Sequence, residues 1–312
     1  MHPCVHAVAR PDKPACVMAA SGISVSYAKL EERSRRCAQM LRGLDIVSGD
    51  TVAICMDNNP HYFELCWAAQ RAGLHYTCIA SALDAADIAG FVRDSGARAL
   101  FLSASQRAQA AGLATLLGAG VERFAVEGSI DGWRDYESSS ARFPAERLSD
   151  ESSGAELVYV RENGGAPRAI RARLNSRPIE ELPSFVQLIG AQYDFCADCV
   201  FLCTAPLHAE ASLGFCMAMQ RYGATAIVME RFDPQWALAL IDQYHVTHSL
   251  WPTPMLEQML QLPASTRHLF DLASHRVAIH AVAPCPPAVR QRISEWWGPI
   301  LHDYHAHLTA GS

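Results

Sequence analysis

The chain has 312 residues, 50% of them apolar and 19% charged, which is enough for one large or two ordinary folded domains. A formal net charge of −6 and the lack of any Lys/Arg run argue against a nucleic-acid surface. Residues 1–22 lack the apolar core of a signal peptide, and no apolar run reaches membrane-spanning length. We therefore expect a cytoplasmic protein whose eleven Cys are reduced thiols.

Strands and amphipathic helices alternate through the first half of the chain, after a leader over residues 1–25 that we expect to pack on the first domain. Ser26 is a candidate helix N-cap, and Gly73 and Gly96 are placed to end later helices. The expected elements are a helix with Leu30, Cys37, Leu41 and Leu44 on one face, a strand over 51–56, a helix carrying Tyr62, Leu65, Cys66 and Ala69, a strand over 74–79, a helix over 84–95 and a strand over 99–102.

Residues 128–155 are rich in Ser, Glu, Asp and Gly and indicate a surface connection, after which the alternation resumes. We expect strands near 199–203, 224–229, 247–250 and 276–280, and helices near 183–193, 211–222, 234–244, 254–261 and 286–297. This pattern is typical of an α/β fold with two packed parallel-sheet subdomains, which we place at residues 1–150 and 151–312.

The stretch 157–170 predicts a short strand that runs into a Gly164–Gly165 turn, followed by Pro167 and Arg168. Backbone N–H groups of a Gly-rich loop, with a cation beside them, can hold a phosphate group. Ordinary surface loops carry the same residues. The pattern by itself leaves both interpretations open.

The stretch resembles the phosphate-binding signature of the adenylate-forming superfamily, Y-[ST]-S-G-T-T-G-x-P-K-G, which is shared by acyl-CoA synthetases, luciferases and peptide-synthetase adenylation domains. Tyr159, Gly165 and Pro167 match, and Arg168 stands where the family has Lys. The loop's hydroxyl residues are replaced, and Glu162 adds a negative charge where the resemblance implies ATP phosphates. Arg168 is either a phosphate ligand or a solvated loop arginine.

Other segments extend the resemblance over roughly residues 5–308. The first half contains "GDTVAICMDNNPHYFELCWAAQRAG" and "VRDSGARALFLS", which resemble segments of the family's first subdomain in their order and spacing. In the second half, "YGATAIVMERFDPQWALALIDQYHVTHSLWPTPML" resembles a branch of fatty acyl-CoA synthetases. The resemblance implies the N-terminal domain of an acyl-CoA synthetase, with the small C-terminal domain and its catalytic Lys absent.

The resemblance also implies nucleotide-site residues. Ala283 and Pro284 match the segment that lies against adenine, although the end of a strand leading into a helix would have the same sequence pattern. Tyr304 matches an aromatic residue that precedes the family's phosphate-binding Thr. Thr309 fits that Thr only with one residue inserted, and Ala310 then stands where the family has its magnesium-binding Glu. Because Ala offers no oxygen ligand, a protein-held Mg²⁺ is not favoured.

Three residues lie in segments that the resemblance places around the family's acyl pocket: His208, which stands where the family has Tyr, Trp251, and Thr253, which is shifted by one place. Each is also explained by ordinary packing, since a lone His or a strand Trp is more often a core or rim residue. Two groups of metal-ligating residue types, Cys196, Cys199 and Cys203, and His302, His305 and His307, lack the spacing of a complete site, and we predict no metal there.

Members of the family convert a carboxylate and ATP to an acyl-adenylate and then transfer the acyl group to CoA. Because the phosphate loop, the magnesium Glu and the Lys domain are altered or missing, we expect a degenerate member with weak or lost ligase activity that keeps nucleotide or acyl binding. Two alternatives are a weakly active adenylating enzyme completed by a partner chain and a non-catalytic interaction subunit, whose apolar edge pairs with another copy or protein. The resemblance implies ATP or AMP and CoA as cofactors, and a carboxylate or acyl-adenylate as ligand.

Overall fold

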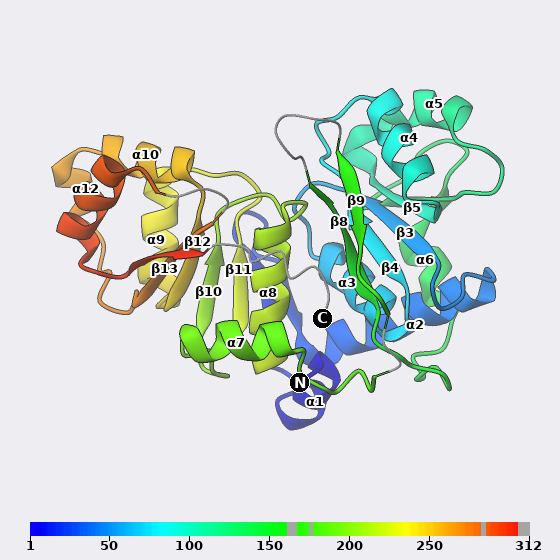
Figure 1. Ribbon diagram of the computed structural model, residues 1–312, viewed down its shortest axis with the longest axis horizontal. Coiled ribbons are helices and arrows are strands. Elements are labelled where there is room, and N and C mark those ends of the chain that lie inside the picture. The colour runs from blue at the N-terminus through cyan, green and yellow to red at the C-terminus, as the bar shows by residue number, and fades with distance from the viewer. Residues whose placement is uncertain (161–166, 175–176, 282–284, 305–312) are drawn as a thin grey trace.

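The computed structural model describes residues 1–160, 167–174, 177–281 and 285–304. Within these ranges the strands form two seven-stranded sheets, and helices cover both of them (Figure 1). Every neighbouring pair of strands is parallel except one pair at an edge of each sheet. The predicted α/β class with two packed, mainly parallel sheets is confirmed.

The first sheet has the strand order β7-β6-β5-β3-β4-β8-β9. Its strands are β3 (Thr51–Cys55), β4 (His75–Cys78), β5 (Ala97–Ser103), β6 (Glu122–Val126), β7 (Arg134–Asp135), β8 (Ala155–Val160) and β9 (Arg168–Arg171). The helices of this half are α1 (Pro3–Ala9), α2 (Tyr27–Gly43), α3 (His61–Arg71), α4 (Ala85–Asp94), the 3₁₀ helix η1 (Ala104–Gln106), α5 (Arg107–Leu116) and α6 (Tyr136–Ala141).

The second sheet has the order β14-β13-β12-β10-β11-β1-β2. Its strands are β1 (Pro14–Met18), β2 (Ser24–Ser26), β10 (Val200–Cys203), β11 (Thr225–Val228), β12 (His248–Trp251), β13 (Val277–Ala281) and β14 (Leu301–Tyr304). The accompanying helices are α7 (Ser184–Gln192), α8 (Glu210–Tyr222), α9 (Pro234–Tyr244), α10 (Thr253–Gln261), α11 (Ala264–Arg267) and α12 (Pro287–Trp297).

The two sheets exchange strands across the boundary that we placed at residue 150. The leader differs from our expectation, because β1 lies inside the second sheet, parallel to β11, with Cys16 opposite Ala226. In return β8 pairs with β4 of the first sheet. The reason is burial: four of the five residues of β1 are buried, so this apolar segment fills a sheet interior rather than a surface.

Local signals in the sequence placed most elements well. The strands β10 to β13 and the five long helices of the second half begin and end within one residue of their predicted positions. Ser26 caps α2, its hydroxyl accepting a hydrogen bond from the N–H of Lys29 at 3.3 Å. The predicted connection over 128–155 contains β7 and the short α6, which the polar composition concealed.

The largest hydrophobic core contains buried side chains from both sheets, among them Phe101 of β5 and Phe201 of β10. Inside it, Trp67 of α3 donates a hydrogen bond from its indole to Gln220 of α8 at 2.6 Å. Two smaller cores lie on the outer faces, one under α9, α10 and α12 and one under α4 and α5. The two units therefore share one interior, which fixes the carboxyl ends of their strands relative to each other.

Candidate functional site

Loops at the carboxyl ends of the two sheets are joined by one side chain. Asn58 follows β3, and its amide donates to the carbonyl oxygens of Ala205, at 3.3 Å, and Met229, at 2.7 Å. Its side-chain oxygen accepts the N–H of Leu207 at 2.7 Å. Since ligands of α/β proteins bind outside the carboxyl ends of parallel strands, this junction marks the candidate site.

His208 lies next to this junction, in the turn between β10 and α8, and is half-buried. Burial lowers the pKa of its imidazole, and the negative charge of Asp57 opposes that shift. Asp57 itself follows β3 and accepts hydrogen bonds from Ser81 at 2.7 Å and Ser105 at 2.8 Å. The half-buried imidazole of His208 is therefore favoured in its neutral form at the carboxyl edge of the sheet, where it can exchange a proton with a ligand or donate a hydrogen bond to it.

A chain of polar side chains closes the same edge at β12, β13 and β14. The hydroxyl of Thr253 lies 2.8 Å from His280 Nε2, and His280 Nδ1 lies 3.3 Å from the carboxylate of Asp303. Arg290 of α12 completes the chain with a 2.5 Å ion pair to Asp303. Sequence reasoning found Thr253 but missed its three partners, because they come from separate strands and a helix.

Trp251 and Tyr304 lie on opposite faces of the second sheet. Trp251 is fully buried in the outer core, its ring centroid 5.1 Å from that of Trp297. Tyr304 faces the inner core, 5.0 Å from the ring of Phe215. Side chains alternate along parallel strands, and Trp251 is in register with His280 while Tyr304 is in register with Ala281. The structure therefore places Trp251 in packing and does not bring it next to Tyr304.

The phosphate-loop stretch is framed by a hairpin of β8 and β9, which pair antiparallel with Val160 opposite Arg168. Arg168 is exposed. The hydroxyl of Tyr159 donates to Asp94 at 2.7 Å, and its ring lies 4.7 Å from Phe91, so α4 anchors the hairpin. Five of the predicted site residues lie outside the described residues: Gly164, Gly165, Ala283, Pro284 and Thr309.

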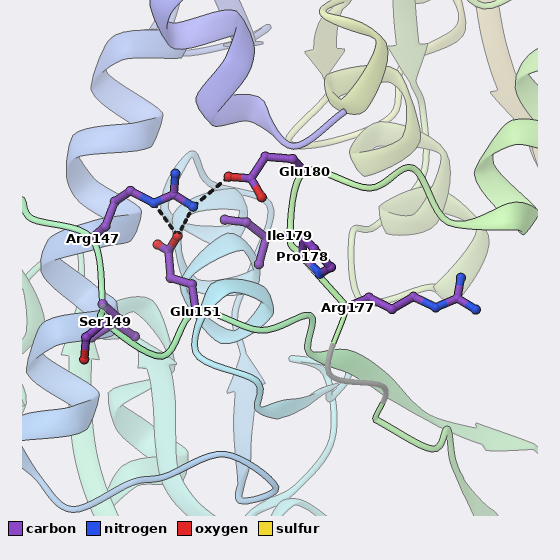
Figure 2. A pocket seen from close by; sticks show the side chains of 8 residues that line it. Arg147, Ser149, Glu151, Arg177, Pro178, Ile179 and Glu180 are labelled. Carbon is purple, nitrogen blue, oxygen red and sulfur yellow. Dashed lines mark hydrogen bonds and ion pairs between the residues drawn. The ribbon is translucent and has the colours of Figure 1, made fainter.

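A separate cavity of about 630 Å³ lies between the segments 147–151 and 177–180 (Figure 2). Arg147 crosses it with ion pairs of 2.6 Å to Glu151 and 2.6 Å to Glu180. The side chain of Arg177 extends away from this group. Because the cavity adjoins the start of β8, whose first residue pairs with the first residue of β4, it lies at the amino ends of the strands.

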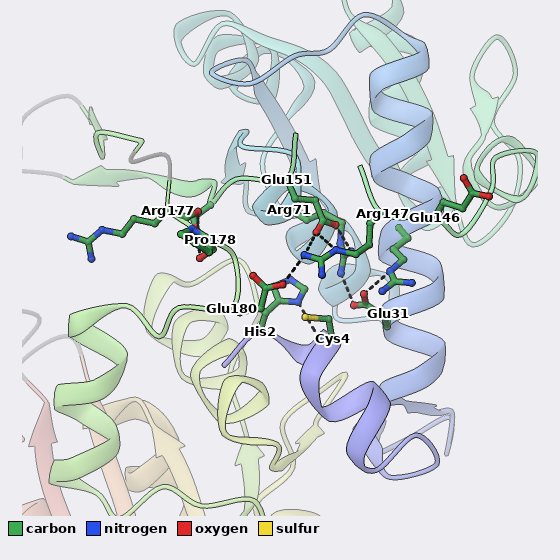
Figure 3. Close-up of polar contacts among 12 residues, drawn as sticks. His2, Cys4, Glu31, Arg71, Glu146, Arg147, Glu151, Arg177, Pro178 and Glu180 are labelled. Carbon is green, nitrogen blue, oxygen red and sulfur yellow. Dashed lines mark hydrogen bonds and ion pairs between the residues drawn. The ribbon is translucent and has the colours of Figure 1, made fainter. Parts of the chain in front are cut away.

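Behind this cavity a network of buried charges joins α2, α3 and the connection between the units (Figure 3). Arg71 is fully buried and pairs with Glu31 at 2.5 Å and with Glu151 at 2.8 Å. His2 lies beside it, fully buried, and burial holds the pKa of its imidazole well below the usual value. The cations of this network are matched by carboxylates, which indicates a structural role.

Among the described residues, no group of three His, Cys, Asp or Glu side chains is placed to hold a metal ion. Over the same residues, no helix combines the length and apolar character that crossing a membrane requires.

Comparison with known proteins gives one family. A family model described as AMP-binding enzyme matches residues 5–161 and 181–305. The chain is 27% identical to 4-coumarate–CoA ligase 5 from Oryza sativa subsp. japonica, over 88% of this chain and 50% of that protein. It is 26% identical to a feruloyl-CoA synthase from an Amycolatopsis species, over 91% of this chain and 54% of that protein. The chain thus spans about half the length of the curated relatives it matches.

Solved structures show the same fold. The inhibitor-bound N-terminal domain of FACL13 from Mycobacterium tuberculosis superposes with a TM-score of 0.80 at 20% identity, covering 96% of this chain and 73% of that one. The amide bond synthetase McbA from Marinactinospora thermotolerans gives 0.79 at 21% identity, covering 97% of this chain and 58% of that one. The expected N-terminal acyl-CoA synthetase architecture is confirmed.

Proposed function

The chain belongs to the AMP-binding enzyme family, and from that premise we propose an acyl-CoA-synthetase-like protein with weak or lost ligase activity that keeps nucleotide or acyl binding. The relatives' names, CoA ligase and CoA synthase, support carboxylate and CoA-thioester chemistry as the starting point. The binding site would lie at the joined carboxyl edges, between the β8–β9 hairpin and the ends of β12 to β14. The proposal includes a cytoplasmic location and a fatty-acid-type or related carboxylate.

The observation that carries this proposal is the contrast between the hairpin and the loop it frames. The strands β8 and β9 pair to form the hairpin, Tyr159 is anchored on α4, and Arg168 is exposed beside the loop. The loop sequence between them contains Arg161, Glu162 and Asn163 and no Ser or Thr. Without hydroxyl donors, and with a carboxylate near the phosphates, the loop stabilises a polyphosphate poorly. AMP or an acyl-adenylate carries less negative charge than ATP, so the same loop disfavours its binding less.

The residues do not fit a protein-held Mg²⁺, because with one residue inserted Ala310 stands where the family has Glu, and its side chain supplies no oxygen. No step of the proposed function therefore runs through magnesium. For the nucleotide, Arg168 would bind phosphate, and the segment that follows β13 would contact adenine. Thr253, positioned by His280, and His208 offer a hydroxyl and an imidazole to the carboxylate or acyl part of a ligand. CoA enters only as the acyl acceptor that the family uses.

Calorimetric titration tests the proposal, using ATP with Mg²⁺, AMP, and a non-hydrolysable acyl-adenylate mimic. We expect the mimic and AMP to bind, ATP to bind weakly, and Arg168→Ala to weaken the phosphate-containing ligands about tenfold or more. Arg173→Ala is the matched control, because Arg173 is another exposed arginine of the same region, beyond the end of β9. Equal loss in both variants would point to a general charge effect and remove Arg168 from the site.

The alternatives give different results in the same experiment. Tight ATP binding followed by pyrophosphate release would support a weakly active adenylating enzyme, and restoration of activity by a second chain would support completion by a partner. Absence of binding by all three ligands would contradict the proposal and favour an interaction subunit. Sedimentation would then test whether the chain forms an oligomer, since Phe185 and Leu188 of α7 are exposed at 44% and 63%, and the ring of Phe185 lies 6.3 Å from that of Tyr304 in β14.

A further inference from the structure

Two cysteines lie in contact in the turn that leads into β10. Cys196 Sγ is 3.1 Å from Cys199 Sγ, and the backbone N–H of Cys196 points at Cys199 Sγ at 3.3 Å. The N–H of Cys199 donates back to the carbonyl of Cys196 at 3.2 Å, which closes a β-turn over Cys-Ala-Asp-Cys. Cys196 is exposed and Cys199 is buried. The third cysteine of the C-x₂-C-x₃-C pattern does not join them, since Cys203 bonds to the carbonyl of Ala205.

The leader places two cations against this turn. Lys13 donates to the carbonyl of Ala197, between the two cysteines, and to the carbonyl of Gly223 at 2.6 Å. Arg10 forms a 2.8 Å ion pair with Asp198, the other central residue of the turn. Burial lowers the pKa of Lys13, whereas negative charge on either cysteine raises it. The coupling is reciprocal, so the Lys13 ammonium stabilises a thiolate in the turn.

We propose that Cys196 and Cys199 form a redox-active dithiol that closes to a disulfide by exchange with a small-molecule disulfide. A β-turn brings its first and last Cα atoms within about 7 Å, and a disulfide needs Cα atoms roughly 4.4–6.8 Å apart. The bond can therefore form with side-chain rotation alone. The pair lies at the amino end of β10, opposite the proposed nucleotide edge, so this inference does not depend on the proposed function.

The exchange has two steps. The Cys196 thiolate attacks one sulfur of the small disulfide, whose S–S bond breaks to release one thiolate and leave a mixed disulfide on Cys196. Cys199 then gives up its proton to solvent and attacks Cys196 Sγ, which releases the second thiolate. Two protein thiols are oxidised and one small disulfide is reduced to two thiols. Cys196 is exposed and Cys199 is buried, so the incoming disulfide reaches Cys196 first.

The experiment treats the folded full chain with oxidised glutathione and follows it by intact mass and by mapping of alkylated peptides. We expect the loss of two hydrogens, an internal Cys196–Cys199 bond and reversal by dithiothreitol. Cys199→Ser should accumulate glutathione on Cys196, and Cys196→Ser should leave Cys199 unmodified. Cys78→Ser is the control, because Cys78 is the other cysteine that is not buried, and it should leave the product unchanged. Lys13→Met should slow the first step several-fold.

Two results would overturn the inference. Glutathione that stays on Cys196 of the unmodified sequence, with no internal bond, would show that the thiols cannot pair. No reaction at either cysteine would show that the turn is closed to disulfides. Circular dichroism of each variant before treatment ensures that unfolded protein is not the source of a changed rate. An unchanged rate in folded Lys13→Met would remove Lys13 from the mechanism and leave the pair itself supported by the other variants.

Discussion

Replacing Arg71 by Met tests how much the buried charge network contributes to the stability of the fold. Arg71 has no solvent exposure, and its carboxylate partners Glu31 and Glu151 have side chains only 7% and 5% exposed. Methionine keeps most of the apolar stem and removes the charge, so the change leaves two buried carboxylates short of a partner. Loss of one member of a buried ion pair costs about 3–5 kcal/mol.

The expected value lies near the lower end of that range. Glu31 keeps Arg35 at 2.7 Å, and Glu151 keeps Arg147 at 2.6 Å, so each carboxylate retains one cation. We therefore expect Arg71→Met to lower the free energy of unfolding by about 3 kcal/mol. Urea denaturation, followed by circular dichroism, measures this as a shift in midpoint at constant slope.

Two comparisons decide whether charge is the cause. The triple variant Arg71→Met, Glu31→Gln, Glu151→Gln removes the stranded carboxylates, so it should be more stable than Arg71→Met alone. Glu32→Gln breaks the solvent-accessible pairs with Lys29 and Arg36 and should cost less than about 1 kcal/mol. A cost below about 1 kcal/mol for Arg71→Met, or a triple variant no more stable than the single one, would refute the reasoning.

The remaining predictions concern pH and packing. Burial lowers the pKa of His275 from 6.5 to about 3, so only the unfolded state takes up its proton as the pH falls. This contribution to the free energy of unfolding is therefore fully present above the pKa of the unfolded state and falls by up to about 1.4 kcal/mol per pH unit below it. His275→Gln should flatten this pH dependence in urea titrations between about pH 7 and about pH 5. An unchanged slope would contradict the prediction. A Cβ at Gly154 would strike the carbonyl oxygens of Leu74 and, at 2.6 Å, Ala69, so Gly154→Ala should cost about 3 kcal/mol in thermal or urea unfolding. Gly214→Ala, in a helix with open space around the new methyl, should stabilise by about 0.5–1 kcal/mol, and similar effects at both glycines would refute the clash.

The periodicity of apolar residues determined the α/β class and nearly all elements of the second half, because each strand and helix buries a face that its own residues specify. One helix start followed from local chemistry as well: Ser26 caps α2 as predicted, and the structure shows Asp84 and Asp233 capping α4 and α9 in the same way. The resemblance that indicated the family, and that predicts a phosphate loop, also rests on contiguous residues, so it required no tertiary structure.

Only the tertiary structure decided which distant segments meet. That β1 enters the second sheet depends on its pairing with β11, some two hundred residues away along the chain, and no local pattern encodes such a partner. The same holds for Thr253 with His280, for the opposite faces taken by Trp251 and Tyr304, and for the ion pairs of Arg71. Local patterns report how much of a side chain is buried, whereas packing of the whole chain determines what it is buried against.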